Sequence, residues 1–151
     1  DYILWAKRNG IRVGPDTAPY WDNTERHRDP SGCGARNALR NSIARVWMRT
    51  LVDCDPDVVY ARTRGSLLSP EANAVTQDLA RVTGVLGCSD PASWLTEEEA
   101  SAMAALCAEF NGGRPDVEQL GRYVFRVNGR RVDFEPWINP HGRVSDRLLA
   151  K

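Results

Sequence analysis

The stretch Arg12-Val13-Gly14-Pro15-Asp16-Thr17-Ala18-Pro19-Tyr20-Trp21 carries the strongest structural signal in this chain of 151 residues. An apolar run stops at Val13, and the Gly-Pro pair that follows favours a turn. Arg12 and Asp16 stand four residues apart across that turn. β/α barrels keep their catalytic groups at the carboxyl ends of the strands. The pattern therefore predicts a strand over residues 10–13 with Asp16 at its functional end.

Two further apolar runs follow, at residues 58–61 and 85–88. Both are short and continuously apolar, as buried parallel strands are. Helical periodicity fills the intervals between the three runs and continues to about residue 110. Alternation of strands and helices indicates parallel strands covered by helices. We therefore expect an α/β fold with three β/α units.

Three helices are expected from their periodicity and caps. An apolar face made of residues at spacings of four and three belongs to the first helix and predicts core packing: Leu39, Ile43, Val46, Trp47 and Leu51. Ser69 is the expected N-cap of the second helix, with Pro70 in its first turn and Gly84 at its end. Thr96 and Glu99 form a capping box at the start of the third helix.

The pattern changes after residue 112. Tyr123, Phe125 and Val127 recur at every second position, as in a strand, and Asn128-Gly129 then favours a two-residue hairpin turn. An antiparallel hairpin after parallel units indicates a new domain. We expect the last β/α units in residues 1–112, a linker at 113–121 and the start of an antiparallel β domain in 122–151.

The composition limits the choice of partner. Twenty basic and twenty acidic side chains cancel, which favours a small neutral ligand over a nucleic acid or a charged membrane surface. No apolar run approaches the roughly 20 residues of a membrane span. The four cysteines form no C-x-x-C pair, and two histidines are too few for a zinc cluster. We expect reduced thiols, no metal, no cofactor and a cytoplasmic setting.

Together with Asp53-Cys54-Asp55-Pro56-Asp57-Val58-Val59-Tyr60-Ala61-Arg62 and Val85-Leu86-Gly87-Cys88-Ser89-Asp90, the opening stretch resembles the α-galactosidases of glycoside hydrolase family 36. The resemblance runs in order from residue 10 to about 110. It implies the C-terminal portion of a (β/α)8 TIM barrel followed by the start of a C-terminal β-sandwich domain. A complete barrel needs roughly 250 residues, so the expectation is a part of one.

The resemblance also implies roles for individual residues. Asp16 would be the general acid/base, Arg12 would bind substrate, and Trp21 would line the sugar pocket. Asp55 and Asp57 would hold Arg12 or Asp16 in place. From the residues alone, an aspartate in a Gly-Pro turn is more often a turn former or helix cap than a catalyst, and Trp21 could equally be a core residue. The family's nucleophile lies on an earlier strand that this sequence does not contain, so we expect the chain alone to be inactive.

The implied activity is retaining hydrolysis of terminal α-galactosides, with a small carbohydrate as partner. Three alternatives stay open: a non-catalytic carbohydrate-binding or interaction module derived from the barrel, a galactosyl transferase of the raffinose-synthase kind, and an α-N-acetylgalactosaminidase. The last two share the acid/base strand and differ mainly in the pocket walls. An oligomer of the parent protein also stays open.

Overall fold

The computed structural model describes residues 10–22 and 32–138. The ends of the expected domains, at residues 1–9 and 139–151, lie outside this part. The helices are α2 (Ala35–Arg45), α3 (Pro70–Thr83), α4 (Glu97–Asn111) and α5 (Glu135–Ile138), with 3₁₀ turns η1 (Val46–Thr50) and η2 (Ala92–Trp94). The strands are β1 (Ile11–Arg12), β2 (Cys54–Asp55), β3 (Val117–Gln119), β4 (Val124–Val127) and β5 (Arg130–Asp133).

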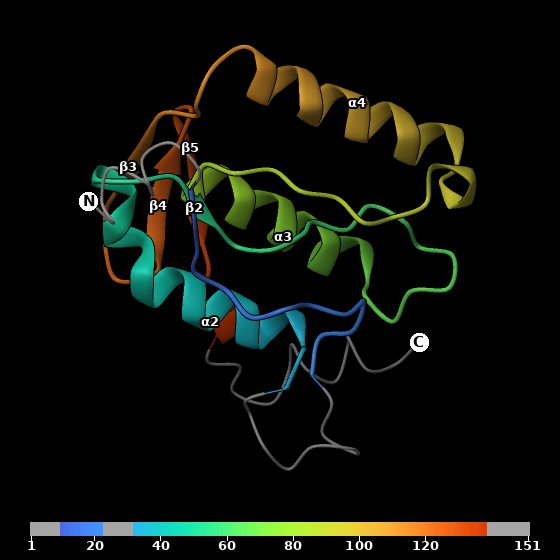
Figure 1. Cartoon of the computed structure of the whole chain (residues 1–151), viewed down its shortest axis with the longest axis horizontal. Coiled ribbons are helices and arrows are strands. Elements are labelled where there is room, and N and C mark those ends of the chain that lie inside the picture. Colours follow the sequence, from blue (N-terminus) through green and yellow to red (C-terminus); the bar gives the residue numbers. More distant parts are fainter. Residues whose placement is uncertain (1–9, 23–31, 139–151) are drawn as a thin grey trace.

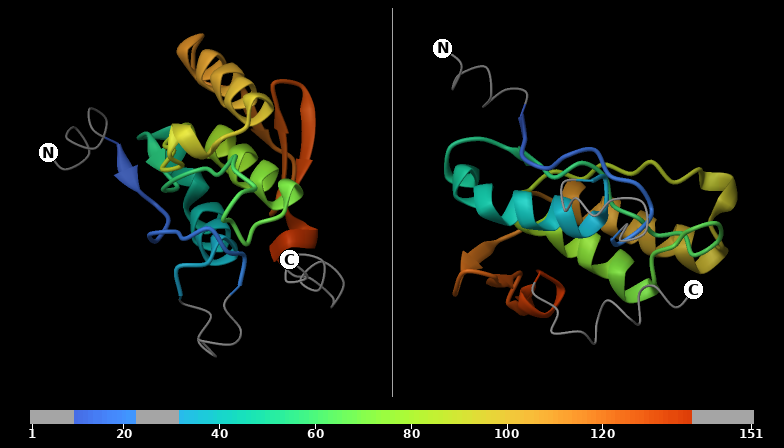
Figure 2. Two further views of the ribbon diagram at one scale, coloured as in Figure 1. Left: turned by 90° about the vertical axis from the view of Figure 1, so that its right-hand side faces the viewer. Right: turned by 90° about the horizontal axis from the view of Figure 1, so that it is seen from below.

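The elements form three layers (Figures 1 and 2). Helices α2 and α3 occupy the middle layer, with the segment that holds β1 on one side and the antiparallel sheet β3-β4-β5 on the other. Helix α4 lies beyond α3. Mixed helix and strand content was expected, and it is confirmed.

The parallel strands run as predicted but are much shorter. Strand β1 pairs in parallel with β2, and single parallel bridges join Cys54 to Gly84 and Val59 to Cys88. The runs at 58–61 and 85–88 are therefore not continuous strands. Pro56 has no N–H to donate to a ladder, and Asp57 has a φ of 90°, which takes the backbone out of the extended conformation. These two residues separate β2 from the bridge at Val59.

The first helix ends earlier than its apolar spacing predicted. Helix α2 stops at Arg45, and the chain continues as the 3₁₀ turn η1. A 3₁₀ turn has three residues per turn rather than 3.6, so the apolar face drifts out of phase. Leu39, Ile43 and Val46 are buried, whereas Trp47 is 62% exposed and Leu51 is 48% exposed. The prediction that these last two residues belong to the core is wrong.

The caps of the other two helices are confirmed. The Ser69 hydroxyl accepts a hydrogen bond from the Ala72 N–H at the start of α3, and Gly84 ends that helix with a φ of 99°. A left-handed residue at this position favours glycine. Thr96 and Glu99 form both hydrogen bonds of a capping box at the start of α4.

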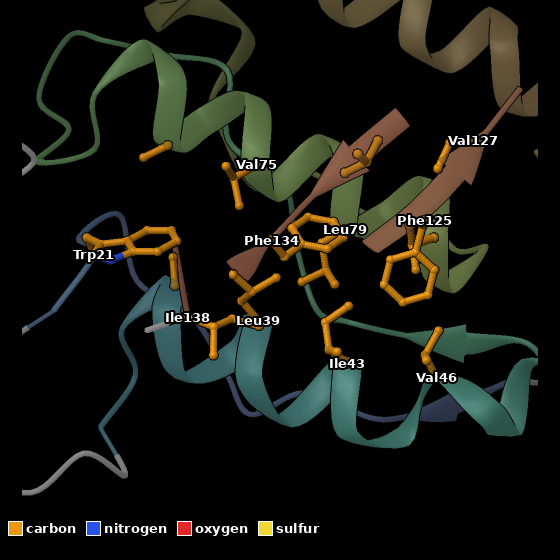
Figure 3. Packing of buried hydrophobic residues seen from close by; sticks show 14 of the residues in the cluster. Trp21, Leu39, Ile43, Val46, Val75, Leu79, Phe125, Val127, Phe134 and Ile138 are labelled. Atoms are coloured by element: carbon orange, nitrogen blue, oxygen red, sulfur yellow. The ribbon is translucent and has the colours of Figure 1, made fainter. Parts of the chain in front are cut away.

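The hairpin is confirmed as well. Asn128 and Gly129 join β4 to β5, and both have positive φ values, as a type I′ turn requires. Strand β3 was not expected, and it lies within residues 113–121, which the sequence suggested as a linker. The apolar side of the sheet packs against α2 and α3 in one cluster, to which β4 and β5 contribute Phe125, Val127 and Val132 (Figure 3). The division into domains stays a prediction.

No helix in residues 10–22 and 32–138 is long and apolar enough to cross a membrane.

Candidate functional site

Arg12 and Asp16 lie at the carboxyl end of β1. The Arg12 guanidinium is 2.9 Å from Asp16 Oδ1 and forms a second ion pair with Asp57 Oδ1. The Asp16 side chain is 91% exposed, whereas the Asp57 side chain is only 16% exposed. Arg12 therefore links an exposed carboxylate to one that is largely enclosed.

Asp57 also holds the residue that follows Asp16. Its Oδ2 accepts a hydrogen bond from the Thr17 N–H at 2.5 Å and one from the Thr17 hydroxyl at 2.8 Å. The Asp57 N–H in turn donates to Asp55 Oδ1 at 2.9 Å, which stabilises the unusual backbone at this position. The two acids thus act in series: Asp55 fixes Asp57, and Asp57 fixes Arg12 and Thr17.

Tyr60 completes this group from the core side. Its hydroxyl donates to Thr17 Oγ1 at 3.1 Å, while that oxygen donates its own proton to Asp57. Burial raises the pKa of the Tyr60 phenol, although the hydrogen bond with Thr17 acts in the opposite direction. Neither Thr17 nor Tyr60 was expected to contribute. Both stand inside the quoted motifs, but a hydroxyl that binds across two segments leaves no periodic signal in a sequence.

Gly14 permits the close approach of the two segments. A Cβ atom built at this position would lie 2.6 Å from the carbonyl oxygen of Pro56, which is shorter than any ordinary contact. A side chain here would push the β1 segment away from residues 56 and 57. The glycine of the Gly-Pro pair is therefore required for the packing of these two segments.

A second ion pair lies at the ends of the next two segments. Arg62 Nε is 2.7 Å from Asp90 Oδ1, and the other Asp90 oxygen accepts the backbone N–H groups of Ala61 and Arg62. The Asp90 side chain is 1% exposed. Asp90 is therefore the ion-pair partner of Arg62.

Trp21 does not occupy the place that the resemblance implied. Its residue exposure is 1%, and it lies in the core beside Leu39 and Ile138, with its ring 5.2 Å from that of Trp137 in an edge-on arrangement (Figure 3). The indole nitrogen has no hydrogen-bond partner among the described residues. A ring enclosed on all sides offers no face to a sugar, so the prediction that Trp21 lines the sugar pocket is corrected to a core role.

A cavity of about 1320 Å³ lies along the outer side of α2. It reaches the site only through residues 12–15 and contains neither Asp16 nor Asp57 in its lining. No group of three or more His, Cys, Asp or Glu side chains within residues 10–22 and 32–138 is arranged to hold a metal ion.

Two solved structures are similar to this chain. The chain is 48% identical to TtGalA, an α-galactosidase from Thermus thermophilus solved with p-nitrophenyl α-D-galactopyranoside, over 83% of this chain and 26% of that one, with a TM-score of 0.73. A structure of TtGalA with stachyose gives 52% identity over 62% of this chain and 21% of that one, with a TM-score of 0.59. No protein-family model matches the chain.

The chain thus spans about a quarter of the length of the enzyme that it matches. The similar region includes most of this chain, and the identity of about half is far above the level at which only a fold is shared. The chain is therefore similar in sequence and structure to part of an α-galactosidase, in agreement with its resemblance to glycoside hydrolase family 36.

Proposed function

We propose that this chain supplies the general acid/base, Asp16, of a retaining glycoside hydrolase that cleaves terminal α-galactosides. The observation that carries the proposal is the hydrogen-bonded support around Asp16. Arg12 binds one of its oxygens, and the following residue, Thr17, is held by Asp57 and Tyr60. An exposed carboxylate on a fixed backbone can meet a substrate from solvent in a constant position.

In a retaining mechanism one carboxylate attacks the anomeric carbon while the other protonates the leaving oxygen and later deprotonates water. Asp16 is proposed for the second role. Arg12 occupies Oδ1, which leaves Oδ2 to exchange the proton. The nucleophile would come from elsewhere in the parent protein, about 5 Å from Asp16. No metal or organic cofactor enters this scheme.

We also propose that the parallel segments at 11–12, 54–59 and 84–88 are the last three strands of a (β/α)8 barrel, and that the antiparallel strands begin a β-sandwich domain. The support is the parallel pairing of the three segments, in chain order, with α2 and α3 as their crossover connections. Asp16, Asp57 and Asp90 then stand at one end of the sheet, which is the catalytic end of a barrel.

A chimera tests the role of Asp16. This chain would replace the matching quarter of TtGalA, which supplies the remaining strands, and hydrolysis of α-galactosides with good and poor leaving groups would be measured. Asp16→Ala should slow poor leaving groups about 10²- to 10⁴-fold, since they need a proton. It should spare the first step with p-nitrophenyl galactoside. Azide should restore part of the turnover, because a small anion attacks the glycosyl-enzyme without a general base.

The matched control is Asp133→Ala, which removes an aspartate from β5 in the opposite layer. It should leave the dependence on the leaving group unchanged. An equal loss for all leaving groups in a folded Asp16→Ala chimera, with no effect of azide, would assign Asp16 to the turn alone.

The alternatives give different outcomes. A carbohydrate-binding module would bind galactosides without any turnover in an intact chimera. A galactosyl transferase of the raffinose-synthase kind would transfer galactose to a sugar acceptor in preference to water. An α-N-acetylgalactosaminidase would prefer the N-acetylated substrate.

A further inference from the structure

Trp94, the last residue of η2, is 47% exposed, although it stands on a fixed part of the fold. Resting on the function proposed above, we propose that its indole ring forms a binding platform for the sugar unit on the leaving-group side of the scissile bond. The ligand class is a neutral oligosaccharide with a terminal α-galactose. Three observations support this proposal: the contact between Arg62 and the ring, the position of Trp94 in the fold, and the polar and apolar groups near it.

The guanidinium group of Arg62 lies over the Trp94 ring, and several hydrogen bonds hold this guanidinium in place. The guanidinium carbon of Arg62 lies 5.1 Å from the centroid of the Trp94 ring, within the range of a cation–π contact. Arg62 is bound by Asp90 and also donates to the carbonyl oxygens of Arg64 and Gly65, at 2.9 and 2.7 Å. A ring held in this way loses little conformational freedom when a ligand stacks on it, which favours binding.

The platform lies at the same end of the sheet as Asp16. The loop that follows the second parallel segment passes beside Trp94, because a Cβ atom built at Gly65 would lie 3.8 Å from the indole ring. The N–H of Leu67 in the same loop donates to the carbonyl of Pro19 at 2.9 Å. Pro19 stands three residues after Asp16. In Figure 1 this loop, the segment after β1 and the start of α4 all lie on the right-hand side. The loop therefore lies between the Trp94 ring and the segment that follows Asp16.

The surroundings fit a sugar. Indole rings pack against the apolar C–H face of a hexose, while hydroxyl groups at the edge of the sugar need polar partners. Glu99 accepts a hydrogen bond from the N–H of Thr96, two residues after Trp94, and others from the N–H and the hydroxyl of Thr63, both at 2.8 Å. Leu67, 60% exposed, adds apolar surface on the same loop.

The test uses the full chain with ¹⁵N-labelled tryptophan, titrated with galactose, melibiose and raffinose. The indole signal of Trp94 should shift with melibiose and raffinose and much less with galactose, and raffinose should bind more tightly than galactose. Trp94→Ala should weaken raffinose binding roughly two- to tenfold, the range of a single aromatic contact. Trp94→Phe, which keeps an aromatic face, should retain part of the affinity.

Trp47→Ala is the matched control, because Trp47 is also exposed but lies on η1, at the other end of the molecule in Figure 1. It should leave raffinose binding unchanged. The proposal is overturned if neither oligosaccharide shifts Trp94, if Trp94→Ala keeps the full affinity for raffinose, or if the variant changes the sedimentation of the chain instead, which would identify a contact between copies. These outcomes do not depend on proton transfer by Asp16, which the chimera measures separately.

Discussion

The hydroxyl of Thr17 links Asp57 to Tyr60 beside Asp16, and Thr17→Val removes it with almost no change in shape. The substitution deletes the bond from Thr17 Oγ1 to Asp57 and takes away the acceptor of the Tyr60 hydroxyl. The backbone N–H of Thr17 keeps its own bond to Asp57. The variant therefore isolates the contribution of one oxygen atom.

The expected loss follows from the two bonds. A hydrogen bond to a charged acceptor contributes about 1.5–3 kcal/mol, and a buried donor left without a partner costs about 1–3 kcal/mol. Tyr60 is 2% exposed, so water cannot readily replace the lost acceptor, but water can still reach the partly exposed Asp57. We expect Thr17→Val to lower the free energy of unfolding by about 2–4 kcal/mol, and Tyr60→Phe by about 1 kcal/mol.

Urea denaturation followed by circular dichroism measures the effect. With a slope of about 2 kcal/mol per molar urea, the midpoint of Thr17→Val should fall by at least about 1 M. Thr17→Ser keeps the oxygen and should stay near the wild type. The double variant Thr17→Val/Tyr60→Phe should lose less than the sum of the single variants, because the two share a bond. A midpoint for Thr17→Val within about 0.2 M of the wild type would refute the arrangement.

Two further predictions concern buried groups. Asp90→Ala leaves the Arg62 charge enclosed without its partner and should lower the free energy of unfolding by about 3–5 kcal/mol, measured in urea, whereas Arg126→Ala on the exposed side of β4 should change it by less than about 1 kcal/mol. Because burial raises the pKa of Tyr60, the unfolded chain releases the phenol proton first as the pH rises past about 10. Stability should therefore fall above that pH in thermal melts, and less steeply in Tyr60→Phe than in the wild type.

The helices and the hairpin were predictable because their signals are local. The Ser69 cap, the Thr96 capping box and the Asn128-Gly129 turn each depend on residues within four positions of one another, and each forms as expected. The end of the first helix was not predictable in this way. The apolar spacing in the sequence continues past Arg45 and gives no sign of the change to a 3₁₀ turn. That change in backbone conformation places Trp47 at the surface.

The site was predictable only in part, for a related reason. The roles of Arg12, Asp55 and Asp57 were expected from the resemblance to the family, and the structure brings the three residues together around one short segment. Which acid binds which donor depends on contacts between segments some 40 residues apart. Trp21 shows the limit of the resemblance, because an aromatic residue beside a catalytic motif can turn into the core as easily as towards a substrate.

The two ion pairs at the sheet end follow one rule. Asp57 binds Arg12 and a backbone N–H just after β1, and Asp90 binds Arg62 and a backbone N–H of the preceding segment in the same way. In both cases a carboxylate at the end of one segment fixes the end of the segment before it. The parallel strands are short, so the backbone N–H groups just beyond their ends have no partner on a neighbouring strand. The aspartate carboxylates accept hydrogen bonds from these N–H groups.

Asp16 holds the corresponding position at the end of β1, yet it departs from this rule. Within the described residues it accepts a bond from Arg12 alone and from no backbone N–H, and most of its side chain is open to solvent. Asp90, by contrast, is enclosed and accepts hydrogen bonds within the fold through both of its oxygens. Because Asp57 holds the backbone beside it, Asp16 is fixed without having to use both of its oxygens for structure. This combination of a supported backbone and an unoccupied oxygen is what proton transfer to a substrate requires.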